Sequence, residues 1–459
     1  MKDWLSLLVC PVLRHPLKKV NGELASEIAT PPMIKYPILD EIPWLFPDPK
    51  HTLHEWRERS QVLLNHLDGE IGDLKVSAGE TDSPLARKRI ESIRALKIRQ
   101  FEFLKKTLEP LKPGKVGQKG ALEKSQAFGY RLPLRQGLLG YFPNLVRDWS
   151  AHFEKENQIS FDAIKDQIPL DASTVLVLGA GGARLAYDVA KAHPTATIIA
   201  FDLNPVLLFA AQSLNRGKST QAAEFSVAPK DPSRPGQVVT LEAKLGPAPN
   251  LHFVFGDVYH LPFATESFDV CLTPWLVDIL PRHVDCLLAS VSQVLKSGGR
   301  WINFGSFRFD FNDPIENISH DELTERSLRF GLSQQTQRQL EIPYLQSAFD
   351  AHRRFETVSI GSWDKTGVLK DTLPTPLDDR AAWIQNPKLS IPALPVFQSS
   401  SATHAVMALV LSLVDGRKSL DEIASVIATE HGMSKDDALE ATASFFDRFL
   451  KDRRFREFT

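Results

Sequence analysis

The chain has 459 residues, of which 43% are hydrophobic and 24% charged, and its formal net charge is −2 at pH 7. This composition is typical of a globular protein with room for about three domains, and the balanced charge excludes a general attraction to nucleic acid or anionic lipid. Three widely spaced cysteines favour neither a disulfide framework nor a cysteine zinc site. We expect a cytoplasmic protein, because the N-terminus has no long apolar core and no apolar run is long enough to span a bilayer.

Residues 1–50 are predicted to form a small β-rich unit. Its segments LLVCP (residues 7–11) and YPILDEIP (residues 36–43) resemble the zinc-ribbon-like activator domains that accompany methyltransferases. Those domains begin with Cys-Pro-x-Cys, whereas Leu13 stands at the second cysteine position after Cys10. We therefore expect a degenerate zinc ribbon without metal, because one thiolate cannot make a four-ligand zinc site. Residues 51–139, rich in Arg, Lys and Glu, are predicted to be a helical region with solvated outer faces.

The stretch from residue 175 to 202 reads VLVLGAGGARLAYDVAKAHPTATIIAFD. It predicts a strand, a glycine-rich turn, a helix and a second strand that ends in Asp202. This pattern is typical of a nucleotide site, because small residues let the backbone approach a ligand and the carboxylate can accept both ribose hydroxyls. Dehydrogenases share the turn, and Tyr187 and Lys191 have the spacing of a dehydrogenase pair. That pair lies on the helix directly after the turn, where it would serve packing and solvation.

Later segments favour methyl transfer over hydride transfer. The motifs resemble those of class I S-adenosyl-L-methionine (SAM)-dependent methyltransferases, in the order that this fold requires: FGDV (255–258), LPF (261–263), ESFDV (266–270), a helix over 284–295, KSGGR (296–300) and WINF (301–304). We therefore predict an α/β, Rossmann-like class I methyltransferase domain over residues 140–370, with SAM as its cofactor.

The middle of the chain also resembles the carnosine N-methyltransferase family, over about residues 140–362. The shared features are LVRDWS (145–150), GAGGARLA (179–186), LN (214–215), a long insertion (216–250), WINFG (301–305) and the segment 318–331. The resemblance implies that SAM contacts Gly179, Ala180, Gly181, Arg184, Asp202, Leu203, Asn204, Asp257 and Val258, with Arg184 lining the methionine end. The family glycine after the turn is Ala183 here, so the turn is expected to sit slightly farther from the ligand.

The methyl acceptor is expected to bind at the segment TPWLVD (273–278). The resemblance implies that Trp275 stacks on a flat ring and that Asp278 accepts the N–H of one imidazole nitrogen. Each residue also has a purely structural interpretation, Trp275 as a core aromatic and Asp278 as a helix cap or surface group. Asp310 stands where the family has a histidine, which suggests a different or more cationic acceptor. Tyr344 is a further candidate whose role is equally explained by packing.

The C-terminal part is predicted to be a separate domain. Five prolines between residues 374 and 395 indicate a linker over residues 371–399. Residues 400–459 resemble the PqqD-like peptide-binding domain and related winged-helix units, with Ser419 and Glu422 as a capping box. A peptide-binding module and a generic three-helix packing or homodimerisation module are both open.

The sequence leaves several functions open. The first is a SAM-dependent N-methyltransferase that acts on an imidazole or amine nitrogen of a small histidine-like molecule or peptide. The second is a peptide-modifying methyltransferase that recruits its substrate through the C-terminal domain. The third is a non-catalytic SAM-binding scaffold, against which the intact Asp202 and Asp257 argue. The lack of a basic run and of an Asn/Asp-Pro-Pro-Tyr/Phe motif disfavours nucleic acid as the substrate.

Overall fold

The computed structural model describes residues 4–26, 33–113, 138–280, 284–311, 314–367, 388–393 and 395–451. The chain divides into two compact units, Met1–Leu377 and Asp378–Thr459. The predicted linker over 371–399 lies largely outside the described residues. Within the described part, every helix is too short or too polar to cross a membrane.

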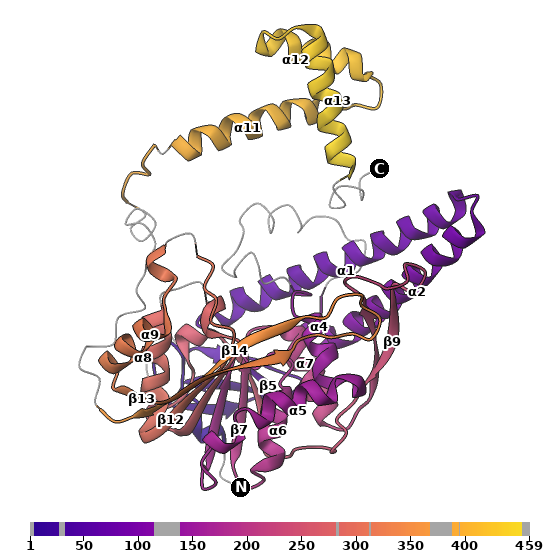
Figure 1. Ribbon diagram of the computed structural model, residues 1–459. Helices are drawn as coiled ribbons and strands as arrows, with labels where there is room; N and C mark the ends of the chain where they lie inside the picture. The colour runs from indigo at the N-terminus through magenta and orange to yellow at the C-terminus, as the bar shows by residue number, and fades with distance from the viewer. Residues whose placement is uncertain are drawn as a thin grey trace. The chain divides into compact units, whose positions relative to one another are not determined.

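A nine-stranded sheet forms the centre of the first unit (Figure 1). Its strands run in the order β13-β14-β12-β11-β6-β7-β10-β5-β4. The central strands are parallel, and they are β6 (Thr174–Leu178), β7 (Thr197–Asp202), β10 (Leu251–Gly256), β11 (Phe268–Pro274) and β12 (Leu295–Gly305). β14 (Phe355–Lys365) runs antiparallel to both β12 and β13 (Leu332–Pro343). An antiparallel strand inserted beside the last parallel strand is the class I methyltransferase arrangement, so the predicted fold class is confirmed.

Helices cover both faces of this sheet, which is why its central strands are buried on both sides. Alternate residues of β6 belong to different cores: Val175 and Val177 face one, Leu176 and Leu178 the other. The first core takes residues from α4 (Phe142–Trp149), α6 (Arg184–Ala192) and α7 (Pro205–Asn215), and α5 (Glu154–Asp162) packs against α4 and α6. The second core takes residues from α8 (Val284–Val294) and α9 (His320–Arg329).

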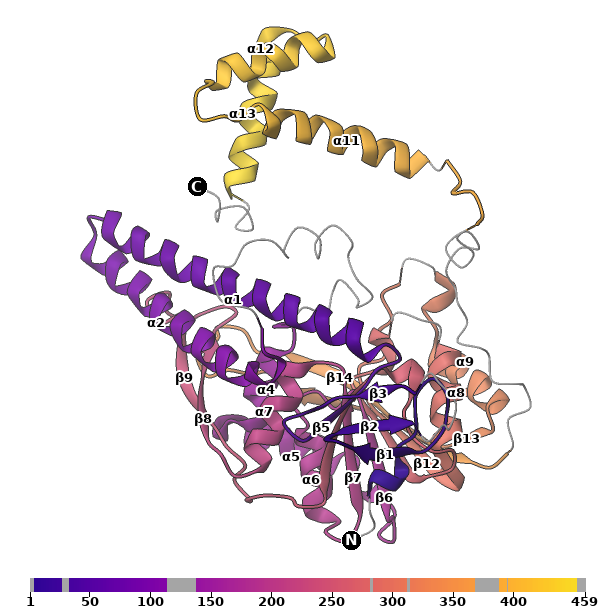
Figure 2. The ribbon, with the colours of Figure 1, turned by 180° about the vertical axis from the view of Figure 1, so that it is seen from behind.

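The N-terminal residues do not stand apart as the predicted separate unit. β1 (Leu17–Val20), β2 (Glu23–Ser26) and β3 (Lys35–Tyr36) form a small antiparallel sheet, seen in indigo in Figure 2. The strands β4 (Ile38–Leu39) and β5 (Ile42–Leu45) instead join the central sheet, where β5 pairs in parallel with β10. β5 pairs there because the edge of β10 offers unpaired backbone groups that β5 satisfies.

The helical region after β5 is a long hairpin of α1 (Pro49–Glu80) and α2 (Pro84–Thr107) (Figure 2). Asp48 and Ser83 cap the two helices, each with a proline at the first helical position. The insertion predicted at 216–250 forms the hairpin β8 (Thr220–Phe225) and β9 (Gly236–Leu241), which packs against α2. Short 3₁₀ helices lie at Trp4–Leu7, Glu109–Leu111, Ala151–Phe153, Lys165–Gln167, Val258–His260, Val277–Ile279 and Pro314–Glu316.

The second unit contains α11 (Pro395–Ser412), α12 (Leu420–His431) and α13 (Lys435–Lys451), drawn in yellow in Figure 1. Its small core is built from Val410, Ile423, Ala424, Ile427 and Ala438. Ser419 and Glu422 make both hydrogen bonds of the predicted capping box, and α12 ends at Gly432 in the left-handed conformation.

Candidate active site

The glycine turn between β6 and α6 forms one wall of the site. Gly179 and Gly181 have φ angles of 65° and 56°, in the left-handed region that favours glycine. A Cβ atom on Gly179 would lie 2.7 Å from Cδ1 of Leu276, so only glycine lets the turn pack against the segment after β11. Ala183 also has a positive φ, 59°, and caps the N-terminus of α6. The turn and the predicted acceptor segment are therefore in direct contact.

Asp202 ends β7 beside this turn. Its Oδ2 accepts a hydrogen bond from the Gly181 N–H at 2.8 Å, and its Oδ1 accepts one from the Asn204 N–H at 2.8 Å. Burial raises the pKa of Asp202 to about 6, although the backbone donors oppose that rise. Among the described residues no cation pairs with this carboxylate. Its remaining acceptor capacity fits the two ribose hydroxyls of SAM.

The other predicted SAM contacts differ in their exposure and in their hydrogen bonds. Asp257 follows β10, next to β7 in the sheet, and its carboxylate is 34% exposed while it accepts from the Tyr259 N–H and contacts His260. Ala180 and Val258 are buried, and Leu203 is half-buried. Asn204 is only 5% exposed, and its Oδ1 accepts from the Val206 N–H as the cap of α7. The Asn204 side chain thus serves the fold.

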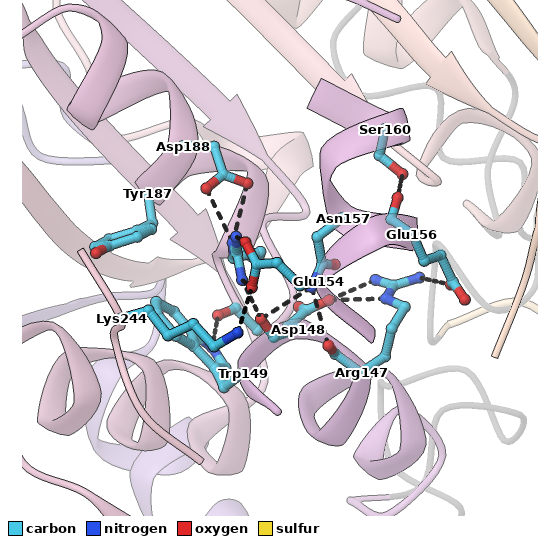
Figure 3. A network of polar contacts seen from close by, with 12 residues as sticks. Arg147, Asp148, Trp149, Glu154, Glu156, Asn157, Ser160, Tyr187, Asp188 and Lys244 are labelled. Atoms are coloured by element: carbon cyan, nitrogen blue, oxygen red, sulfur yellow. Dashed lines mark hydrogen bonds and ion pairs between the residues drawn. The ribbon is translucent and has the colours of Figure 1, made fainter. Parts of the chain in front are cut away.

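Arg184 is buried and belongs to an ion-pair network whose members Asp148, Glu154 and Asp188 are labelled in Figure 3. Its guanidinium bonds to Asp188 at 2.9 Å and to Glu154 at 2.6 Å, and it also donates to the Asp148 carbonyl. All three of its nitrogens are engaged, and these partners raise its pKa. Nearby acceptors hold the guanidinium between α5 and α6, and the predicted place of Arg184 at the methionine end stays a prediction.

Helix α4 contributes residues that the sequence analysis did not assign to the site. Trp149 donates from its indole nitrogen to the Gly182 carbonyl at 2.7 Å, so α4 is fixed against the glycine turn. Tyr141, Asn144 and Arg147 are spaced by three residues and lie along α4 or at its start. Burial raises the pKa of the Tyr141 phenol, and the nearby carboxylates of Asp202 and Asp278 add to that rise. Polar residues at helical spacing were the signal that could have found this face.

The predicted acceptor residues Trp275 and Asp278 stand on either side of Leu276, which packs against Gly179. The Trp275 N–H donates to the Phe304 carbonyl at 2.7 Å, and the ring centroid of Trp275 is 4.9 Å from that of Tyr344. Asp278 is 7% exposed, and its Oδ2 accepts from the Ser306 hydroxyl at 2.5 Å and from the Arg308 N–H at 3.0 Å. The Oδ1 atom of Asp278 is buried and has no hydrogen-bond partner among the described residues. Burial raises the pKa of Asp278.

Tyr344 contacts both Asn144 of α4 and the ring of Trp275. Its hydroxyl accepts from the Asn144 amide at 2.9 Å, and the guanidinium groups of Arg147 and Arg354 lie 5.7 and 4.6 Å from its ring centroid. The ring therefore joins α4 to Trp275, and its role in the site stays a prediction. Asp310, by contrast, is exposed in the loop after β12, so its side chain lies outside the buried group around Asp278.

Comparison with known proteins agrees with this geometry. Residues 138–349 match the carnosine N-methyltransferase family. A carnosine N-methyltransferase from Dictyostelium discoideum is 27% identical over 215 residues, which cover 40% of this chain and 44% of that protein. The chain thus matches less than half the length of this curated relative.

Two solved structures are among those similar to the chain. The first is a complex of the Haloferax volcanii Trm112 methyltransferase activator with a methyltransferase, at 15% identity, 50% coverage of this chain, 96% of that chain and a TM-score of 0.33. The second is YcgJ from Bacillus subtilis, at 14% identity, 47% coverage of this chain, 99% of that chain and a TM-score of 0.33. Residues 138–349 thus resemble the carnosine N-methyltransferase family, and the strand order is that of a class I, SAM-dependent methyltransferase.

Proposed function

We propose that this chain is a SAM-dependent N-methyltransferase that methylates an imidazole or amine nitrogen of a small histidine-like molecule or peptide. One observation carries the proposal: Leu276 packs directly on Gly179, so the cofactor turn and the segment with Trp275 and Asp278 form two walls of one site. That site lies at the carboxyl ends of the parallel strands, where doubly wound sheets bind ligands. A cytoplasmic location is part of the same proposal.

The first wall would hold SAM, whose sulfonium supplies an electrophilic methyl group. Asp202 would accept the ribose hydroxyls, the Gly179–Gly181 turn would let the ligand approach the backbone, and Asp257 and Val258 would face the next part of the nucleoside. Arg184 on α6 and Arg147 on α4 both already pair with carboxylates, Arg184 with Glu154 and Asp188 and Arg147 with Asp148 and Glu156. We therefore keep Arg184, the residue that the resemblance implies, as the partner of the methionine carboxylate.

The second wall would orient the acceptor. The partner-free Oδ1 of Asp278 can accept the N–H of one imidazole nitrogen, while Trp275 stacks on the ring. The lone pair of the other nitrogen would then form the N–C bond as the C–S bond breaks and its electron pair stays on sulfur. Asp278 can take the N–H proton, which leaves a neutral methylated imidazole. Alignment supplies most of the acceleration in such a displacement.

The proposal is tested by incubating the protein with SAM and each of carnosine, histidine, a thiolated histidine and histidine-containing peptides, with mass spectrometry as the readout. We expect a mass gain of one methyl group on at least one of them. Asp278→Asn should lower turnover by about 100-fold, the effect of lost acid-base assistance, and should leave SAM affinity unchanged. SAM binding without methylation of any acceptor would favour the scaffold function instead.

Ser306→Ala is the matched variant for Asp278→Asn, because it keeps the carboxylate and removes one donor to it. Loss of that donor should raise the pKa of Asp278 further, since the hydrogen bond stabilises the ionised form. The acidic limb of the pH profile of turnover should therefore move to higher pH. An unmoved limb would mean that Asp278 does not titrate in the reaction.

A second candidate function is favoured by the C-terminal unit. That unit has its own core, and its helix α11 exposes the apolar side chains of Val406, Met407 and Leu411. We propose that it is a PqqD-like module that recruits a peptide carrying the acceptor. In that case the peptides of the screen should be methylated far better than the free amino acids.

A further inference from the structure

The loop of residues 257–264, here the 257–264 loop, begins with Asp257 and Val258 at the end of β10. Because Asp202 ends the neighbouring strand β7 and is proposed to hold the ribose, the end of β10 should face the adenine side of the same ligand. The affinity for SAM should therefore depend on how well the conformation of this loop is fixed. This step rests on the proposed function.

N-terminal residues form hydrogen bonds with the backbone of residues 261–264 of this loop. The Val9 N–H donates to the Pro262 carbonyl at 2.9 Å, and the Ala264 N–H donates to the Leu7 carbonyl at 2.8 Å. The guanidinium of Arg14 donates to the Leu261 carbonyl and, at 2.5 Å, to the Phe263 carbonyl. One arginine thus bridges two carbonyls of a loop that lies about 250 residues away in the sequence.

The start of the loop is fixed by the same N-terminal segment. Leu45 of β5 is in register with Gly256, the last residue of β10. A Cβ atom on Gly256 would lie 3.1 Å from the Leu45 carbonyl oxygen and 2.6 Å from Cε2 of Phe201. This close packing fixes the backbone at the start of the loop. Arg14 contacts the end of the loop, at Leu261 and Phe263.

The turn that carries Arg14 belongs to the segment that resembles a zinc-ribbon-like activator domain. The Arg14 N–H donates to the Cys10 carbonyl at 2.9 Å, and Arg14 has a φ of 58°. The Cys10 sulfur receives the Leu13 N–H at 3.2 Å and lies 3.0 Å from the Tyr36 hydroxyl. The turn is thus held by hydrogen bonds to sulfur. Within the part of the chain that the structure describes, no cluster of metal-ligating side chains is present.

We propose that Arg14 is a positioning residue for the cofactor: through the Leu261 and Phe263 carbonyls it keeps the 257–264 loop in the conformation that binds the adenine side of SAM. The N-terminal unit thereby acts as a built-in support of the SAM site. A loop that is ordered only part of the time lowers apparent affinity in proportion to its ordered fraction, so loss of the bridge should weaken SAM binding about tenfold. Once SAM is bound, the loop is ordered and turnover at saturating SAM should stay near the parental value.

The test uses the full chain with Arg14→Met and a matched control, Arg216→Met. Arg216 also joins the N-terminal unit to the body, through Asp40 at 2.9 Å and Glu41 at 2.6 Å, but it lies at the end of α7 and not at the loop. Calorimetry gives the dissociation constant of SAM, and steady-state kinetics separate KM for SAM from kcat. Arg14→Lys, with one cationic donor centre, should recover part of the lost affinity.

We expect Arg14→Met to raise the dissociation constant and KM for SAM about tenfold with kcat retained, while Arg216→Met stays within about twofold of the parent. Hydrogen exchange without any ligand should be faster in peptides covering residues 257–264 of Arg14→Met only. Unchanged SAM affinity in Arg14→Met, or an equal loss in Arg216→Met, overturns the inference. If Arg14→Met does not fold, Arg14→Lys with parental affinity and parental exchange overturns it. A parental protein that binds no SAM overturns the proposed function instead.

Discussion

At the scale of single residues, the carboxylate of Asp202 combines burial with a lack of cationic partners among the described residues. Burial disfavours the ionised form, and the N–H groups of Gly181 and Asn204 only partly offset this. The pKa of about 6 means that the side chain changes charge just below neutral pH. Its capacity to accept hydrogen bonds from a ligand therefore changes in the same pH range.

We predict that SAM affinity rises with pH through about 6 and then levels off, because only the ionised Asp202 accepts both hydroxyls. Below that pH the affinity should fall by at most tenfold per pH unit, as one proton is involved. Calorimetry from about pH 5 to about pH 8 measures this. Asp202→Asn should bind SAM more than about tenfold more weakly and show no such slope, whereas Asp310→Asn should behave like the parent. A slope that persists in Asp202→Asn would contradict the assignment.

At the scale of elements, the Ser-Phe-Asp motif that helped to identify the fold proves to be a structural joint. The Oδ2 of Asp269, near the start of β11, accepts from the backbone and hydroxyl groups of Ser173 and Thr174, next to the start of β6. Its Oδ1 bonds to Lys296 at 2.6 Å. These donors hold the pKa of Asp269 well below its usual range. The joint lies at the amino ends of the strands, opposite the site.

Asp269→Asn should therefore lower the free energy of unfolding by about 2 kcal/mol without changing SAM affinity. Because the folded pKa is depressed, the carboxylate stabilises the fold above its unfolded pKa of about 4, and this stabilisation is lost as pH falls through the folded value. Urea unfolding should thus show a smaller difference between variant and parent in strong acid than at neutral pH. Weakened SAM binding in folded Asp269→Asn would show that the joint also shapes the site.

At the scale of the whole molecule, the chain has two units with separate cores. Every residue assigned to the site belongs to the first unit. The exposed apolar side chains of α11 and α12 belong to the second. Substrate recruitment and methyl transfer are therefore open to separate tests.

A variant that lacks residues 388–459 should keep its SAM affinity, and its turnover of a free small acceptor should stay within about twofold of the parent. If the second unit recruits a peptide, the same variant should lose turnover of the peptide acceptor at low peptide concentration. Calorimetry and mass spectrometry measure the two properties on the same samples. Loss of SAM binding on truncation would contradict the division of roles.

The sequence by itself was sufficient for the local features of this protein. The glycine turn, the strand that ends in Asp202 and the capping box at Ser419 each depend on residues that are near one another in the chain. Their spacing sets the backbone conformation, and the order of such elements was enough to predict the class I fold. The contacts of Trp275 and Asp278 were predicted only through a family resemblance and stay a prediction.

Tertiary structure alone decided which distant groups became partners. Arg184 has an acceptor four residues away in Asp188, but its pairing with Glu154 depends on how α5 packs against α6. The parallel pairing of β5 with β10 joins residues that lie more than 200 positions apart, and so does the bridge from Arg14 to the 257–264 loop. A local pattern fixes a residue's conformation and face, whereas its partner is whichever compatible group the packed chain brings within hydrogen-bond distance. For that reason the sequence indicated a methyltransferase, and only the fold showed that its N-terminal residues bind the 257–264 loop.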